Sequence, residues 1–147
     1  MNTIIRPVES SDLKPFLPLL YSYIVQFYKQ PPPNFSDLEA FVKSFFQSEK
    51  GIQFIALQNH HIVGFATLYF TYSTLKVAPV TIMNDLFVIE DKRGMGIARQ
   101  LFQACQQYTC THQFAYMSWI TAKENKEAQR FYQKLGAQEG NWIGYMI

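Results

Sequence analysis

Hydrophobic residues recur along the chain with two different periods, and the change of period separates helical from strand segments. In the first third, apolar residues return every three or four positions, as on one face of a helix. Near residue 51 the period becomes two, which indicates strands. Helices are predicted over about residues 12–28, from Ser36 to a stop at Gly51, from residue 98 to about residue 108, and from Thr121 to Leu135. Strands are predicted at Ile4–Val8, Ile52–Gln58, His61–Tyr72, Val80–Ile89, Phe114–Ile120 and Trp142–Ile147.

The order of these elements predicts one α/β domain over residues 1–147. Antiparallel strands come first, and a strand–helix–strand unit follows, so the sheet should be mixed. We expect six to seven strands in the order β-α-α-β-β-β-α-β-α-β, with helices on both faces. Ser36 with Glu39, and Thr121 with Glu124, have the spacing of capping boxes at two helix starts.

Composition excludes several classes of protein. The chain has 147 residues, of which 48% are hydrophobic and 16% charged, so global disorder is excluded. A net charge of +2 is too balanced to indicate nucleic-acid binding. Cys105 and Cys110, together with three histidines, show no metal-ligand spacing, so no metal is expected. Without an apolar stretch of membrane-spanning length or a signal peptide, a cytoplasmic protein with no membrane partner is expected.

A glycine-rich turn between a strand and a helix is the strongest chemical signal. Gly94 and Gly96 would let the backbone approach an anion closely, and the free N–H groups of the following helix start would bind phosphate. The alternative is a helix start that merely tolerates two glycines. The turn lacks both the Gly-Lys-Ser/Thr of a P-loop and the third glycine of the dinucleotide fingerprint.

The segment Arg93-x-x-Gly96-x-Ala98 resembles the pyrophosphate-binding motif of the GNAT acetyltransferase superfamily. The resemblance covers nearly the whole chain. It extends to Ile4–Pro7, Ile62–Ala66, Trp119–Thr121 and Asn125–Ala137. Within the superfamily, Tyr69–Tyr72 and Asn84–Val88 most resemble the diamine acetyltransferases and the small yeast-type histone or amino-acid acetyltransferases.

This resemblance implies an N-acetyltransferase that moves acetyl from acetyl-CoA to a primary amine by direct attack in a ternary complex. The acceptor would be a small amine, an amino acid or a protein lysine, and many relatives are homodimers. The family opens its sheet after the fourth strand to admit the pantetheine arm. The implied acetyl-CoA contacts are Arg93, Gly94, Met95, Gly96, Ile97, Ala98 and Arg99 at the pyrophosphate, Leu86, Phe87 and Val88 along the pantetheine, and Asn125 and Ala128 on the far wall.

The reaction needs a proton donor for the departing thiolate and a route by which the attacking amine loses its proton. The resemblance implies Tyr132 as the general acid, since a phenol matches a thiolate in basicity; the alternative is a core tyrosine. Asp85 interrupts an apolar strand and is the candidate base; the alternative is a structural carboxylate. Asn84 stands where related diamine acetyltransferases carry Glu. Both side chains can face one site only if a bulge intervenes, and a water chain to bulk solvent is a further route.

The acceptor segments lack carboxylates. Residues 13–36 and 60–84 contain no Asp or Glu, whereas a polyamine needs a negative partner for each buried ammonium. We therefore expect an acceptor with one amine, lined by Tyr21, Tyr23, Phe27, Tyr28, Tyr69, Phe70 and Tyr72. Two other functions fit the same pattern: a non-catalytic acyl-CoA-binding module on this fold, and a protein-interaction domain without a CoA site.

Overall fold

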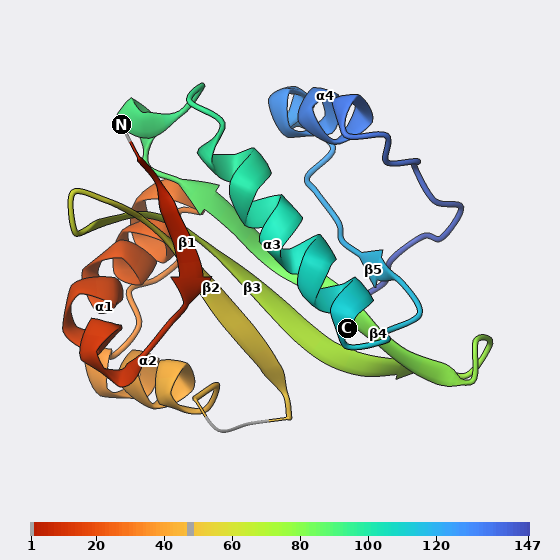
Figure 1. Cartoon of the computed structure of the whole chain (residues 1–147), viewed down its shortest axis with the longest axis horizontal. Helices are drawn as coiled ribbons and strands as arrows, with labels where there is room; N and C mark the ends of the chain where they lie inside the picture. The colour runs from red at the N-terminus through yellow and green to blue at the C-terminus, as the bar shows by residue number, and fades with distance from the viewer. Residues whose placement is uncertain (1, 47–48) are drawn as a thin grey trace.

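The computed structural model describes residues 2–46 and 49–147, and a five-stranded mixed sheet runs through its centre (Figure 1). The strands lie in chain order across the sheet. Neighbouring strands are antiparallel, except for the last pair, which is parallel. The strands are β1 (Ile4–Pro7), β2 (Gly51–Gln58), β3 (His61–Ser73), β4 (Ala78–Val88) and β5 (Met117–Ser118).

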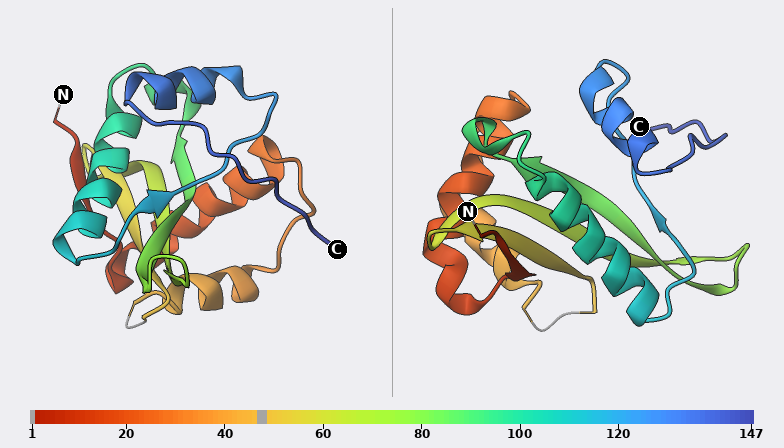
Figure 2. Two further views of the ribbon diagram at one scale, coloured as in Figure 1. Left: turned by 90° about the vertical axis from the view of Figure 1, so that its right-hand side faces the viewer. Right: turned by 45° about the horizontal axis from the view of Figure 1, so that its top comes forward.

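Helices cover both faces of this sheet, as predicted. Helices α1 and α2 lie on one face and α3 crosses the other, while α4 stands beyond α3 near the C-terminal end (Figures 1 and 2). The four α-helices are α1 (Leu13–Ser22), α2 (Phe35–Lys43), α3 (Ile97–Thr111) and α4 (Lys126–Lys134). Short 3₁₀ turns cover Ser10–Asp12 and Glu90–Lys92, and one π-helical turn covers Tyr23–Phe27.

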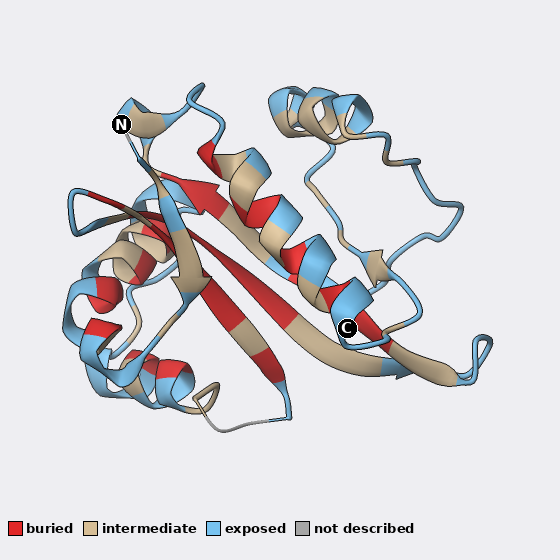
Figure 3. Ribbon diagram, in the orientation of Figure 1, coloured by how far each residue is buried: buried red, intermediate tan, exposed pale blue. Residues whose placement is uncertain are grey.

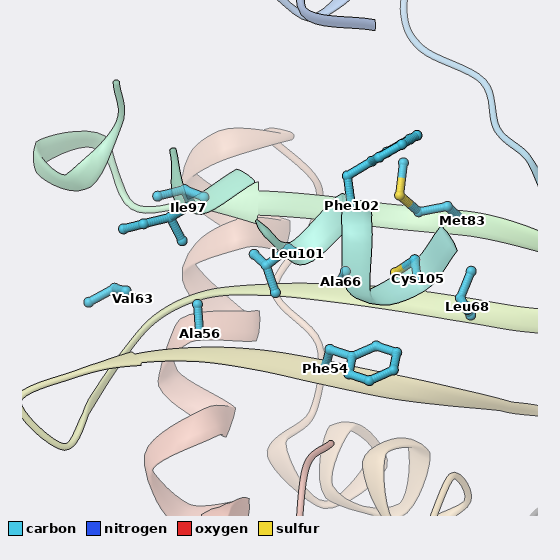
Figure 4. Packing of buried hydrophobic residues seen from close by; sticks show 11 residues of the cluster. Phe54, Ala56, Val63, Ala66, Leu68, Met83, Ile97, Leu101, Phe102 and Cys105 are labelled. Atoms are coloured by element: carbon cyan, nitrogen blue, oxygen red, sulfur yellow. The ribbon is translucent and has the colours of Figure 1, made fainter. Parts of the chain in front are cut away.

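The sheet separates two hydrophobic cores because successive side chains of a strand point to opposite faces. On the α3 side, Ile97, Leu101 and Cys105 recur every fourth residue and pack onto the inner strands (Figure 4). On the other side, the Phe16 ring of α1 meets the Phe65 ring of β3 edge-on, with 5.5 Å between ring centroids. Burial is concentrated along β2, β3, β4 and the sheet-facing stripes of the first three helices (Figure 3).

One continuous helix was predicted over about residues 12–28, but the structure breaks it into two parts. The regular α-helix ends at Ser22, and the backbone widens into a π turn in which the N–H of Tyr28 donates to the carbonyl of Tyr23 at 3.1 Å. Pro18 adds a second irregularity, because it has no N–H to donate within the helix. The apolar period survives these changes, which is why the sequence pattern resembles one helix.

The helix starts differ from the predicted capping boxes. Asn34, not Ser36, is the N-cap of α2, and its side chain accepts a hydrogen bond from the Ser36 N–H at 2.8 Å. Asn125, not Thr121, caps α4 and accepts from the Ala128 N–H at 3.1 Å. In both cases the Asn directly before the first helical residue, Phe35 or Lys126, takes the place of the predicted hydroxyl.

The predicted six to seven strands are wrong: the described residues form five. Strand β5 is two residues long instead of Phe114–Ile120, and Trp142–Ile147 forms no strand and is exposed. An alternating apolar pattern forms a strand only beside an edge that can pair with its backbone. Within the described chain, no such edge lies against residues 142–147.

A partly buried ion pair joins β1 to the start of α1. The Arg6 guanidinium donates to both carboxylate oxygens of Asp12, at 2.7 and 2.9 Å, and the Glu9 N–H donates to the same carboxylate. The hydrogen bonds from Arg6 lower the pKa of Asp12, against the opposing effect of burial. Because this pKa is lower in the folded chain than in the unfolded one, the pair stabilises the fold above about pH 3.9, and the contribution disappears as pH falls through the folded value.

We expect Asp12→Asn to lower the free energy of unfolding by about 1.5–3 kcal/mol at neutral pH, because it removes a charge-assisted partner from Arg6. Its stability should also depend less on pH between about 2 and 4. Urea unfolding measures both effects. Glu39→Gln is the matched control: Glu39 pairs with Lys43 on the exposed face of α2, and its loss should cost less than about 1 kcal/mol. An equal loss of unfolding free energy in the two variants would contradict the stabilising role of the Arg6–Asp12 pair.

Candidate active site

A loop with two left-handed glycines joins β4 to α3. Gly94 and Gly96 have φ angles of +76° and +82°, a region that glycine enters without strain. A Cβ atom added at either position would meet nothing within 4 Å, so the backbone here faces open space. Gly96 is the N-cap of α3, a helix of 15 residues. The first-turn N–H groups of a helix have no partner within it, so this end of α3 offers donors and a positive dipole to an anion.

Strand β4 has a free edge just before this loop. Its pairing with β5 is limited to Thr81 with Met117 and Ile82 with Ser118. From Met83 to Val88, no described strand lies on that side of β4. The Ile89 N–H donates to the Val63 carbonyl of β3, so by alternation the polar backbone groups of Val88 face the free edge. The sheet therefore opens after β4, as the family resemblance implies.

The side chain of Arg93 is directed to β4 and does not extend freely from the loop. Its Nε donates to the Val88 carbonyl at 2.8 Å. Its guanidinium carbon lies 5.5 Å from the ring centroids of both Phe27 and Phe87, within cation–π range. Arg93 thus holds the loop against the strand end and against the π turn that follows α1.

A β-bulge in β4 brings two of the predicted catalytic side chains together. Thr67 pairs with Asp85 and Leu68 with Met83, so Asn84 is left without a partner on β3. Both side chains then lie on the same side, and the Asn84 amide donates to the Asp85 carboxylate at 3.2 Å. Asn84 and Asp85 were predicted to face one site only if a bulge lay between them, and the structure confirms that bulge.

Two tyrosines complete this group. The Tyr23 hydroxyl, from the π turn, donates to Asp85 at 2.9 Å, and the Asn84 amide donates to the Tyr69 hydroxyl at 3.2 Å. Burial raises the pKa of both tyrosines, and the negative charge of Asp85 raises it further. Both phenols therefore stay protonated near neutral pH. We call Tyr23, Tyr69, Asn84 and Asp85 the acceptor-side cluster.

Tyr132 on α4 lies across from this cluster. Its ring is half-buried and packs against Trp119, with 5.2 Å between centroids. Burial raises the pKa of Tyr132, and Tyr28 contributes a smaller increase. The Tyr28 ring lies 5.0 Å from that of Tyr23. Tyr28 therefore influences the pKa of both Tyr132 and Tyr23, the partner of Asp85, although these residues come from distant parts of the sequence.

Three other residues that were predicted to line the acceptor site make their contacts outside the acceptor-side cluster. Phe70 lies on the opposite face of the sheet, stacked on Tyr108, and Tyr72 is exposed near the turn after β3. Tyr21 stacks on Phe35 of α2. The side chain of Asn125 is used in capping α4, which places this residue in a structural role. The link from Tyr23 to Asp85 spans 62 residues, and no local sequence pattern signals it.

The fold places the free start of α3 beside the open edge of β4, which is the arrangement that the family resemblance implies for an acyl-CoA-dependent acyltransferase. A model of the Acetyltransferase (GNAT) family matches residues 20–137. The chain therefore belongs to the GNAT acetyltransferase family, and this confirms the predicted enzyme class, an N-acetyltransferase that uses acetyl-CoA. The comparisons leave the predicted subgroup and the individual site residues as predictions.

Several proteins are similar to this chain. An uncharacterized N-acetyltransferase, YhfO of Bacillus subtilis (strain 168), is 30% identical over 135 residues, covering 92% of this chain and 89% of that protein. Aminoglycoside N(6')-acetyltransferase type 1 of Salmonella typhimurium (strain LT2) is 28% identical over 96 residues, covering 63% of this chain and 66% of its own length. The structure of aminoglycoside N-acetyltransferase AAC(6')-Iy in complex with CoA has a TM-score of 0.85 and 23% identity, covering 99% of this chain and 94% of that one.

The described residues show neither a metal-binding cluster nor a membrane-spanning helix. Within residues 2–46 and 49–147, no group of three or more His, Cys, Asp or Glu side chains is placed to hold a metal ion. None of the helices in the described part of the chain combines the length and apolar character needed to cross a membrane.

Proposed function

We propose that this enzyme acetylates an acceptor with a single amine, by direct attack on acetyl-CoA in a ternary complex. The observation that carries the proposal is the bulge in β4. The bulge directs Asp85 and Asn84 into the tyrosine-lined cluster. The residues that follow them on β4 form the free edge of the sheet. An amine bound at the cluster and a thioester laid along that edge would lie close enough to react without a covalent enzyme intermediate.

The cosubstrate would bind along β4 and at the start of α3. The backbone of Gly94 to Arg99 would hold the pyrophosphate, where the glycines leave open space. Along the free edge, Leu86 and Val88 would pair with the pantetheine as a neighbouring strand would. Because Arg93 already occupies the Val88 carbonyl, the groups left for this pairing are the Val88 N–H and the outward-facing groups of Leu86.

Asp85 would bind the acceptor as its ammonium form, and the reactive neutral amine would form when the ammonium proton is transferred away from nitrogen. Tyr23 and Asn84 both donate to the same carboxylate oxygen, which fixes the direction in which the other oxygen points. The proton leaves either to that carboxylate or through water to bulk solvent. Asn84 cannot accept a proton at its amide, so its role would be to position Asp85.

Tyr132 would give its proton to the CoA thiolate as the tetrahedral intermediate collapses. Its raised pKa keeps the hydroxyl protonated at neutral pH, and such proton transfer is worth about 10²–10⁴ in rate. The phenol is re-protonated afterwards from solvent, so the cycle needs no metal.

The single carboxylate of the cluster supports a single-amine acceptor such as a free amino acid or a lysine side chain. Its other described members are neutral, and the nearby Phe27 and Tyr28 add only aromatic surface. An aromatic face attracts a cation by about 0.5–2 kcal/mol, which is too little to hold a second buried ammonium. The aminoglycoside acetyltransferases among the relatives support a polycationic acceptor as the second candidate.

Gly96→Asp is expected to lower acetyl-CoA affinity at least about a hundredfold, because a carboxylate would repel the pyrophosphate at close range. Gly96→Asn is the matched control: it has the same size, tolerates a positive φ and carries no charge. Calorimetric titration with acetyl-CoA compares the two. Unchanged affinity in Gly96→Asp would show that the pyrophosphate lies elsewhere.

Tyr132→Phe is expected to lower turnover at least about tenfold with little change in acetyl-CoA affinity, since the hydroxyl acts only as the thiolate leaves. Tyr108→Phe controls for the loss of a partly buried hydroxyl on a helix outside the site. Steady-state thiol release and a binding titration separate the two effects. Full turnover in Tyr132→Phe would remove this residue from the mechanism.

Thiol release from acetyl-CoA should be faster with a free amino acid, a simple monoamine or a lysine peptide than with spermidine, spermine or an aminoglycoside. The physical reason is the single carboxylate of the acceptor-side cluster. The measurement is kcat/KM across this panel. A value for spermidine or an aminoglycoside above that of every monoamine would overturn the proposed acceptor class. Binding of acetyl-CoA without turnover on any acceptor would instead indicate a non-catalytic acyl-CoA-binding module.

A further inference from the structure

A row of polar side chains crosses the centre of the sheet on the face that α1 and α2 cover. Gln53 of β2 lies opposite Thr67 of β3, and Thr67 lies opposite Asp85 of β4. Side chains of directly opposed residues share one face of an antiparallel sheet, so this row ends at the acceptor-side cluster. The neighbouring row on the same face, two residues along each strand, is entirely apolar and consists of Ile55, Phe65 and Phe87. The polar row is thus a local exception in an apolar layer.

Gln53 and Thr67 are buried, and one of their polar atoms has no partner. The two residues are 3% and 0% exposed. The Gln53 amide donates to the Thr67 hydroxyl at 3.1 Å, whereas Gln53 Oε1 accepts no hydrogen bond from the described residues. A buried polar atom without a partner destabilises a fold, and two apolar side chains of similar size would fill the same space without that effect. Stability alone therefore does not account for this pair.

Thr67 is placed to donate a hydrogen bond to Asp85. Its oxygen already accepts the Gln53 amide, so its hydroxyl proton remains available to a second group. The Cβ atoms of opposed residues in an antiparallel pair lie about 4.5–5.5 Å apart, so rotation of the carboxylate brings it within reach of this hydroxyl. Tyr23 and Asn84 already donate to Asp85 Oδ1, from the π turn and from β4 itself. Thr67 would add a donor from β3.

We propose that Thr67 is a positioning residue: in the ternary complex its hydroxyl, directed by Gln53, donates to the Asp85 carboxylate and holds it toward the acceptor ammonium. This inference rests on the role that the proposed function gives to Asp85. Hydrogen bonds within a site are often long in the free enzyme and shorten when substrate binds. An ionised carboxylate offers roughly four acceptor positions, so donors from Tyr23, Asn84 and Thr67 leave one for the ammonium. Held from three separate elements, the carboxylate is less free to turn away from the amine.

The test is Thr67→Val, which keeps the shape of the side chain and removes the hydroxyl. Thiol release is measured with saturating acetyl-CoA and the amine of the acceptor panel that reacts fastest. We expect kcat/KM for this amine to fall at least about tenfold, as for the loss of one hydrogen bond to a charged group. Acetyl-CoA affinity in a calorimetric titration should not change. Thr67→Ser restores the hydroxyl and should keep kcat/KM within about threefold of the unsubstituted enzyme.

Thr81→Val is the matched control. Thr81 lies on β4, is 0% exposed and shares a hydrogen bond of 2.8 Å with the Thr109 hydroxyl of α3. The substitution therefore removes the same kind of buried, bonded hydroxyl from the other face of the sheet. Its kcat/KM should stay within about twofold of the unsubstituted enzyme. Equal losses in Thr81→Val and Thr67→Val would overturn the inference.

A double-mutant cycle with Asp85→Asn distinguishes positioning from a merely structural role. If Thr67 acts through Asp85, adding Thr67→Val to Asp85→Asn should lower kcat/KM by about twofold at most. Two losses that multiply would overturn the inference. So would full activity in Thr67→Val beside an impaired Asp85→Asn, and the proposed role of Asp85 would then stand. An undiminished kcat/KM in Asp85→Asn would overturn that role, and this inference with it.

Far-UV circular dichroism establishes whether each variant is folded. If Thr67→Val does not fold, Gln53→Met takes its place, because it leaves Thr67 intact and removes the amide that directs the hydroxyl. It should lower kcat/KM at least about threefold in the unsubstituted enzyme and not in Asp85→Asn. Full activity in Gln53→Met would then overturn the inference.

Discussion

The geometry of the site depends on the single extra residue in β4. Without the bulge at Asn84, strict alternation would place Asn84 and Asp85 on opposite faces of the sheet. With it, both reach the side covered by α1 and the π turn, where Tyr23 donates to Asp85 at 2.9 Å. The π turn is the complementary irregularity, since it presents Tyr23 and Phe27 toward β4. Strand β4 and the π turn each depart from regular structure where they face one another, which is typical of functional sites.

The same strand also provides the free edge, because β5 pairs with it over only two residues. Arg93 connects these features. It bonds the last carbonyl of β4 and stacks on Phe27 from the π turn and on Phe87 from the strand. The loop that would hold the cosubstrate is therefore packed against the element that would hold the acceptor, so the two binding regions share one set of contacts.

The splayed sheet also explains the exposure of the C-terminal third. A β5 with two paired residues covers little of the core, and α4 follows it without a single buried residue. Tyr132 and Leu135 on α4 are only partly buried against the α3-side core.

The sequence by itself determined the element order, the two-sided sheet and the glycine turn. These features are expressed in local periodicity and in residue types, such as the glycines at positive φ, that tolerate few alternatives. It also indicated that Asn84 and Asp85 could meet only through a bulge. Only the tertiary structure decided that the bulge exists, that Tyr23 is the partner of Asp85, and that Arg93 is held against β4. It likewise decided that Trp142–Ile147 has no strand partner among the described residues. Contacts across tens of residues, and the presence of a pairing edge, depend on where other segments lie, and no local pattern encodes that information.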